Sequence, residues 1–181
     1  GIFGGPSDAS AQTDAFSRPF YKTINRFSAN FALTADLCLG LLAGDIKRKE
    51  MLSGRLADIH SHLFIATAIL KFYEKGQRSE AEQQHAQLAL EKAFVQIQDA
   101  FDGLFANFPM RAASCAVKFI CFPFGRVAQQ PSDQLKTQLG RAIMENNPFR
   151  EQLKQHVFYN TDPNDVFGRM ENAFQAALKI D

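Results

Sequence analysis

Few residues of this 181-residue chain combine types and spacings that could do chemistry. His60 and His62 stand two positions apart, so on a helix their rings point to different faces, whereas a helical zinc site needs two histidines four apart. The sequence contains no Cys-x-x-Cys pair and no Gly-x-Ser-x-Gly elbow, and GIFGG at the start lacks the strand–turn–helix context of a phosphate loop. His85 and His156, the two remaining histidines, belong to no recognisable motif either. We therefore assign no catalytic, cofactor-binding or metal-binding residue.

The three cysteines, Cys38, Cys115 and Cys121, are odd in number, and each lies in an apolar helical context. We expect buried free thiols in a reducing compartment.

Residues 110–126, MRAASCAVKFICFPFGR, are the most suggestive of binding. Basic residues accompany a run of large apolar side chains, and two interpretations remain open. The segment could lie on an anionic membrane or on a partner, as a basic amphipathic helix with exposed rings does. Alternatively, the rings fill the core of a helical bundle. The candidate surface residues are Arg111, Lys118, Phe122, Phe124 and Arg126.

Two further charge groups have a structural and a functional interpretation. The first group is the basic cluster of Lys47, Arg48 and Lys49, which predicts a solvated helix start. Its positive charge is unfavourable at the N-terminal end of a helix dipole, which leaves room for an acidic neighbour. Arg55 and Asp58 stand three apart, which predicts an ion pair on the helix surface or a pair that orients a partner.

The elements that must position these residues are helices. The central one spans residues 47–76, with Asp45 as a candidate cap and with Gly76 ending it in the left-handed conformation. A first helix starts with Pro19 in its first turn and ends at Gly44, and a third runs from a Ser79–Glu82 capping box to Pro109. The apolar stripe of the central helix recurs every three or four residues: Leu52, Leu56, Ile59, Leu63, Ala66, Leu70 and Tyr73.

The second half of the chain predicts shorter helices. One covers residues 111–122 and is broken by the turn at 122–125, and another runs from a cap at Ser132 or Asp133 to about Met144. Asn147–Pro148 and Asp162–Pro163 each predict a cap followed by a proline, and the last helix ends near Leu178.

The expected fold class is therefore all-α: an up-and-down helical bundle of three long helices plus several shorter C-terminal helices. Residues 1–17 predict a linker or surface arm, and residues 18–181 a single helical-bundle domain. Apolar residues make up 46% of the chain and the net charge is +1, which is typical of a globular domain without a nucleic-acid partner. We find no signal peptide and no span of about 18 uninterrupted apolar residues in the sequence. We therefore expect a cytoplasmic protein.

Several blocks of sequence, in order, resemble one family over roughly residues 16–158. They are FSANFALTADLCLGLLAGDIKRKEMLSG followed by RLADIHSHLFIATAILKFYEKG, then NFPMR at 107–111, FPFGR at 122–126 and PSDQL at 131–135. The series is similar to the C-terminal region of bacterial long-chain acyl-CoA dehydrogenases of the FadE type. It also looks like the C-terminal extension of the mitochondrial very-long-chain enzymes.

The resemblance implies a parent enzyme that uses FAD and a catalytic Glu to oxidise fatty acyl-CoA to trans-2-enoyl-CoA in fatty-acid β-oxidation. The Glu takes the α-proton and the flavin takes the β-hydride. It implies that both lie upstream, in a dehydrogenase core of the same polypeptide, so no residue here is matched to them. The segment itself would have a structural or docking role. We further expect that the protein forms homo-oligomers and makes peripheral contact with the inner membrane. The alternative is a free-standing helical interaction module without enzymatic activity.

Overall fold

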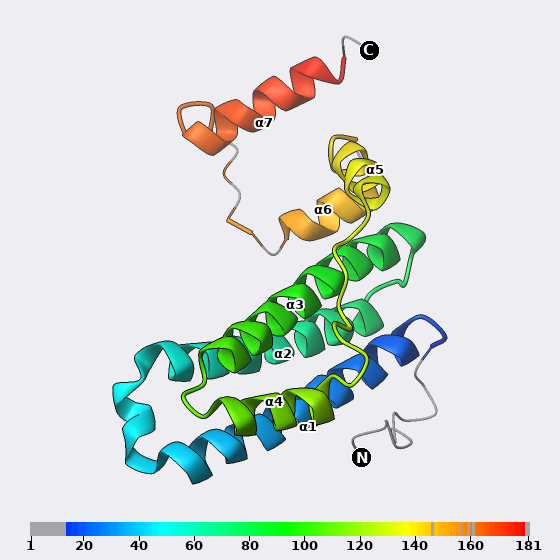
Figure 1. Ribbon diagram of the computed structural model, residues 1–181. Helices are drawn as coiled ribbons and strands as arrows, with labels where there is room; N and C mark the ends of the chain where they lie inside the picture. Colours follow the sequence, from blue (N-terminus) through cyan, green and yellow to red (C-terminus); the bar gives the residue numbers. More distant parts are fainter. Residues whose placement is uncertain (1–13, 146, 156, 159, 161, 180–181) are drawn as a thin grey trace. The chain divides into compact units, whose positions relative to one another are not determined.

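The computed structural model describes residues 14–145, 147–155, 157–158, 160 and 162–179. Its described part contains helices and no strands, which confirms the predicted all-α class (Figure 1). The chain divides into two compact units, residues 1–132 and 133–181, and each is described by itself. The single domain expected over residues 18–181 stays a prediction, and most of the expected arm at 1–17 lies outside the described residues.

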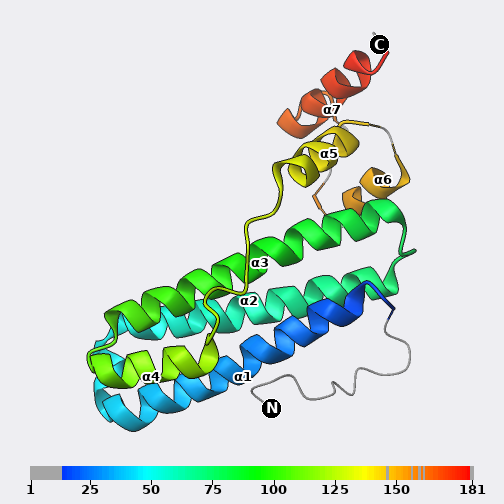
Figure 2. The ribbon, with the colours of Figure 1, turned by 45° about the vertical axis from the view of Figure 1, so that its right-hand side comes forward.

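The first unit is an up-and-down bundle. Helices α1 (Ser17–Leu42), α2 (Glu50–Lys75) and α3 (Glu80–Asn107) alternate in direction, so that each runs antiparallel to the next, as Figures 1 and 2 show. The short helix α4 (Arg111–Cys121) packs against α3 and α1. Core side chains come from all four helices, and rings from α1, α3 and the end of α4 meet at their centre: Phe27, Phe101, Phe105 and Phe122.

Helix α1 starts two residues before Pro19, which still falls in its first turn. The Asp14 carboxylate accepts a hydrogen bond from the Ser17 N–H at 2.7 Å and so satisfies one of the free donors of this helix start. The helix ends at Leu42 because Ala43, and not Gly44, takes a positive φ of 43°. The predicted end is therefore wrong by two residues.

The central helix begins at Glu50, so the expected start at Lys47 is wrong. Lys47 and Arg48 belong to the last turn of a 3-10 helix, η1 (Ala43–Arg48), and Asp45 lies in the first turn of η1 instead of capping α2. Cations are favourable at the C-terminal end of a helix and acids at its N-terminal end. This register places Lys47 and Arg48 at the favourable end of η1, whereas Lys49 stays at the N-cap position of α2.

The connection between α2 and α3 confirms the capping box and corrects the role of Gly76. Ser79 Oγ accepts from the Glu82 N–H at 3.2 Å, and the Glu82 carboxylate accepts from the Ser79 N–H at 2.9 Å. Gly76 has an extended backbone with φ −77° and ψ −169°, while Arg78 takes the positive φ of 56°. The left-handed residue of this turn is thus an arginine two positions later.

The second unit contains α5 (Asp133–Ile143), α6 (Pro148–Lys154) and α7 (Val166–Ala177). Helix α5 begins at Asp133, which places Ser132 at the N-cap position. Asn147 caps α6 as predicted, with its Oδ1 accepting from the Arg150 N–H at 2.8 Å. The predicted Asp162 cap of α7 is wrong, because Asp165 accepts from the Phe167 N–H at 2.9 Å.

Gly168 lets the Asp162 carbonyl approach the first turn of α7 closely. A Cβ on Gly168 would overlap the Asp162 carbonyl, so the chain can approach the first turn of α7 only over a glycine. Asp162 instead accepts from the Asn164 N–H at 2.9 Å in the turn before the helix.

Candidate functional site

Helix α4 has one buried and one exposed apolar side. Ser114, Val117 and Cys121 face inward and are buried, and Ser114 Oγ donates to the Phe105 carbonyl at 2.7 Å. Because residues three and four apart share a helix face, the remaining apolar positions line the opposite side. We define the exposed apolar residues of α4 and the following turn as the α4 face: Ala112, Cys115, Ala116, Phe119, Ile120 and Phe124.

The rings of the α4 face are strongly exposed. Phe119 is 69% exposed and Phe124 is 94% exposed. Phe124 lies in the predicted turn, in which the Gly125 N–H donates to the Phe122 carbonyl at 3.0 Å and Gly125 takes a φ of +82°. The turn therefore holds the Phe124 ring away from the core.

The predicted basic residues bind inside their own unit. Arg126 donates to Asp99 at 2.6 Å and to Asp102 at 2.7 Å, and Lys118 Nζ lies 3.4 Å from Asp102. The hydrogen bond to Asp99 raises the pKa of Arg126. These contacts fasten the end of α4 and its turn to α3, so the two cations are paired with acids of the bundle.

Arg111 has a different anchor. Its Nη1 donates to the Ala106 carbonyl at 2.7 Å, at the C-terminal end of α3 where a cation is favourable. All three predicted cations thus contact α3, and none of them belongs to the apolar stripe of α4.

Phe122 corrects the predicted surface, because it lies in the core. Its ring is 5.3 Å from Phe101 and 6.2 Å from Phe27, measured between centroids. The carbonyl of the preceding residue, Cys121, accepts from the buried amide of Asn30 at 3.2 Å. The core interpretation therefore holds for Phe122, whereas Phe124 lies at the surface.

Sequence reasoning missed Asp99 and Asp102, which hold the predicted cations. Two acids three apart on α3, away from its apolar stripe, were the available signal, but their partner Arg126 lies 24 and 27 residues further along the chain. The buried Gln98 was missed as well, and its Oε1 accepts from the Val127 N–H at 3.2 Å.

The cysteines divide into two kinds. Cys38 and Cys121 are buried as predicted, and burial raises the pKa of both thiols. Cys115 is exposed on the α4 face, so the expectation of a buried thiol is wrong there.

The histidines are separated as predicted from their spacing. His60 stacks on Phe31 with centroids 5.8 Å apart, whereas His62 Nδ1 lies 2.8 Å from the Asp58 carbonyl. His85 Nδ1 lies 2.7 Å from the Ala81 carbonyl, and His156 lies outside the described residues. Within the described residues, no three His, Cys, Asp or Glu side chains come together as a metal site would need.

Arg55 and Asp58 do not form the predicted ion pair. Arg55 Nη1 donates to the Met51 carbonyl at 3.3 Å, and its side chain crosses α3 at Gly103. A Cβ on Gly103 would come within 2.9 Å of Arg55 Nε, so the glycine leaves space for the guanidinium.

A cavity of 510 Å³ lies between α1, α3 and residues 127–132. Its lining carries the Glu91 carboxylate and the amides of Gln87, Gln129 and Gln130, and it has no basic side chain. A pyrophosphate requires cations or clustered N–H donors, so this cavity does not fit FAD.

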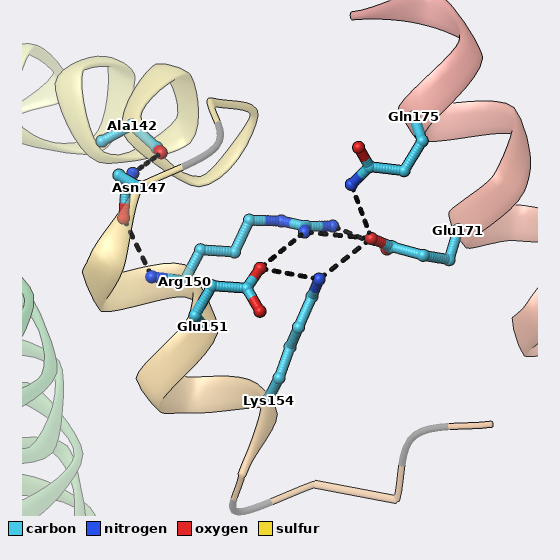
Figure 3. A network of polar contacts seen from close by, with 7 residues as sticks. All are labelled: Ala142, Asn147, Arg150, Glu151, Lys154, Glu171 and Gln175. Carbon is cyan, nitrogen blue, oxygen red and sulfur yellow. Dashed lines mark hydrogen bonds and ion pairs between the residues drawn. The ribbon is translucent and has the colours of Figure 1, made fainter. Parts of the chain in front are cut away.

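The second unit contains a polar network between α6 and α7 (Figure 3). Arg150 and Lys154 of α6 each reach Glu171 of α7 at 2.9 Å, and Gln175 donates to the same carboxylate at 2.9 Å. Chiefly through the Arg150 hydrogen bond, the pKa of Glu171 is lowered to about 2. We interpret the network as the connection that holds α6 on α7.

Among the residues that the structure describes, one stretch, Ser17–Arg48, is long and apolar enough by length and composition alone to cross a membrane. Asn30 and Asp36 interrupt this stretch, so it is not a run of about 18 uninterrupted apolar residues. Ile24, Phe27 and Cys38 of this stretch are buried in the bundle core.

The family model of the acyl-CoA dehydrogenase C-terminal domain, bacterial type, matches residues 2–181. No solved structure matches the chain.

Proposed function

The chain belongs to the bacterial-type acyl-CoA dehydrogenase C-terminal family, and from this premise we propose that it is the helical C-terminal domain of a FAD-dependent enzyme. The parent enzyme would oxidise fatty acyl-CoA to trans-2-enoyl-CoA in fatty-acid β-oxidation. The flavin and the catalytic base would belong to the preceding dehydrogenase core, because the family of this chain is that of a C-terminal domain. This placement gives the present chain a role in docking instead of chemistry.

We infer that the α4 face is the docking surface and that the dehydrogenase core of the same polypeptide covers it. The observation that carries this inference is the exposure of Phe119 and Phe124 on an uncharged face. Burial of apolar surface is the main favourable term of protein association, and a ring that is 94% exposed contributes little to its own fold.

The charges beside the α4 face favour a protein over an anionic membrane. Electrostatic attraction to acidic lipids amounts to about 1 kcal/mol for each free Lys or Arg near the surface. Here Lys118 and Arg126 are paired with Asp99 and Asp102. We propose a cytoplasmic protein, and peripheral contact with the inner membrane becomes the alternative that the experiment must separate.

Cys115 tests the proposal, because it is the exposed cysteine of the three and belongs to the α4 face. The intact polypeptide is labelled with a maleimide, and the peptide containing Cys115 is quantified by mass spectrometry against the rate in denaturant. A covered face predicts slow labelling in the native enzyme. It also predicts faster labelling in a Phe119→Ser/Phe124→Ser variant, in which the docking surface is weakened.

Liposomes of anionic lipid distinguish the alternative. If Cys115 labels at the denatured rate in buffer and slowly with liposomes, the face binds a membrane and the core-docking proposal is overturned. Fast labelling in both conditions would leave the face open and contradict docking altogether. An immunoblot of the source cells tests the free-standing module, because such a module would give a band at the 20.2 kDa of this chain.

A further inference from the structure

A second cavity, of 450 Å³, lies where the start of α2 meets the end of α3. Its lining contains three cationic side chains, those of Arg48, Lys49 and Arg55, and we call it the basic cavity. In the described part of the chain none of the three forms an ion pair, in contrast to Lys118 and Arg126 beside the α4 face. Their charges are therefore available to a ligand.

One acid also lines the basic cavity. It is Glu50, and one carboxylate against three cations leaves an excess of positive charge. Glu50 is exposed in the first turn of α2, a position where the helix dipole itself favours an acid. The basic cavity therefore suits an anionic ligand.

The start of α2 adds N–H donors to the basic cavity. Lys49, at the N-cap position, provides no side-chain cap. The N–H groups of Leu52 and Ser53 donate to the Lys49 carbonyl at 2.9 and 3.1 Å. Those of Glu50 and Met51 are left without an acceptor in the described part of the chain. Free N–H groups beside cations are the combination that binds phosphate.

Arg55 reaches the basic cavity across α3, over Gly103. A Cβ on Gly103 would lie 2.9 Å from Arg55 Nε, so the glycine admits the guanidinium. Arg55 gives one donor to the Met51 carbonyl and keeps further N–H groups for a ligand. The Asn107 amide donates to the Gly103 carbonyl at 2.7 Å, which leaves its Oδ1 as an acceptor. The lining thus combines cations that suit phosphate with an amide oxygen that can accept a hydrogen bond.

We propose that the basic cavity binds the phosphate groups of coenzyme A. A phosphomonoester carries a charge of about −1.5 to −2 at pH 7, and coenzyme A has one at its 3′ position besides its diphosphate. FAD has the diphosphate alone, so coenzyme A is the more anionic of the two phosphate ligands of the proposed enzyme. The choice of coenzyme A rests on the proposed function, whereas the suitability of the cavity for phosphate does not.

Protection from chemical modification tests the basic cavity by itself. The intact polypeptide is treated with phenylglyoxal, which modifies arginine, and the peptide containing Arg55 is quantified by mass spectrometry. Coenzyme A should protect Arg55 in a saturable way, and adenosine should not. Dephospho-coenzyme A, which lacks the 3′-phosphate, should need about a tenfold higher concentration or more, because a charged hydrogen-bonding group is lost.

Variants of the lining locate the site. Arg48→Gln/Lys49→Gln should raise the coenzyme A concentration for half protection by about tenfold or more. Gly103→Ala should raise it as well, because the added methyl group displaces the guanidinium. The matched controls are Lys92→Gln, an exposed cation of α3, and Gly54→Ala, whose Cβ would meet nothing within 4 Å. Both controls should leave half protection unchanged, and circular dichroism melts check that each variant is folded.

Three outcomes overturn the proposal. Equal protection by coenzyme A and dephospho-coenzyme A would mean that the 3′-phosphate is not bound. Protection by liposomes of anionic lipid and not by coenzyme A would mean that a lipid headgroup occupies the basic cavity. Protection that does not respond to Arg48→Gln/Lys49→Gln would place the bound nucleotide elsewhere.

Activity of the same preparation separates this inference from the proposed function. An enzyme that oxidises fatty acyl-CoA while coenzyme A leaves Arg55 unprotected keeps the proposed function and overturns the inference. A polypeptide that oxidises no fatty acyl-CoA, but in which coenzyme A protects Arg55, contradicts the proposed function and supports the phosphate site.

Discussion

The carboxylate of Glu82 lies where a side chain on Gly76 would have to be. A Cβ on Gly76 would come within 2.6 Å of Glu82 Oε1. That carboxylate is held by the Ser79 N–H at 2.9 Å, the Ser79 hydroxyl at 3.2 Å and the Gln77 N–H at 3.3 Å. The connection between α2 and α3 thus depends on glycine for space, since the backbone of Gly76 is extended and suits any residue.

Gly76→Ala should destabilise the bundle, because Glu82 must leave part of the capping box. We expect a loss of about 1 kcal/mol, the usual cost of losing a helix cap. Gly40→Ala is the matched control, since it lies within α1 with open space around its Cβ. It should stabilise by about 0.5–1 kcal/mol through helix propensity. Urea unfolding followed by circular dichroism measures both, and equal effects would contradict the steric argument.

Leu63→Ala should lower the free energy of unfolding by about 2–5 kcal/mol, as for other large-to-small changes in a packed core. Leu63 is 7% exposed and belongs to the core of the bundle. Met51→Ala on the same helix is the control, because Met51 is exposed and its loss should cost less than about 0.5 kcal/mol. A small effect at Leu63 would mean that the buried side of α2 is wrongly assigned.

Arg126→Gln should loosen the turn after α4 at small cost. Arg126, Asp99 and Asp102 are all partly exposed, so each ion pair contributes about 0.2–1 kcal/mol and less at high salt. A double-mutant cycle with Asp102→Asn in low and high salt isolates the pair. A coupling free energy that does not fall with salt would contradict an exposed, screened ion pair.

The long helices were predictable because each keeps one apolar stripe at a spacing of three and four over many turns. Local signals also placed the caps at Ser79 and Asn147. Asp162–Pro163 failed as a cap because Asp165 competes three residues later and Gly168 admits the Asp162 carbonyl. That approach depends on three-dimensional packing, which the cap-then-proline pattern does not contain.

The surfaces were less predictable than the helices. The spacing of apolar residues predicts one buried side for each helix, and it does not predict a second, exposed apolar side such as that of α2 around Phe64. In residues 110–126, Phe122 and Phe124 have the same residue type and are two positions apart, yet one is buried and the other exposed. Only the turn geometry at Gly125 separates them.

The contact between α6 and α7 should weaken in acid. Arg150, and then Gln175 and Lys154, hold the pKa of Glu171 at about 2, below its ordinary 4.5. A carboxyl group whose pKa is lower in the folded chain stabilises the fold above its unfolded pKa and loses that contribution as pH falls through its folded pKa. The stabilisation should therefore be complete above pH 4.5 and decline from there towards pH 2.

Carbon-detected NMR titration of the Glu171 carboxyl group measures this pKa directly, and urea unfolding between the same pH limits measures its effect on stability. Glu171→Gln should be less stable than the parent above pH 4.5, and the difference should shrink in acid because both side chains are then neutral. Glu151→Gln, at a more exposed carboxylate of the same network, is the control and should change the pH dependence less. A Glu171 midpoint near 4.5 would show that Arg150 and Lys154 do not hold its carboxylate in solution.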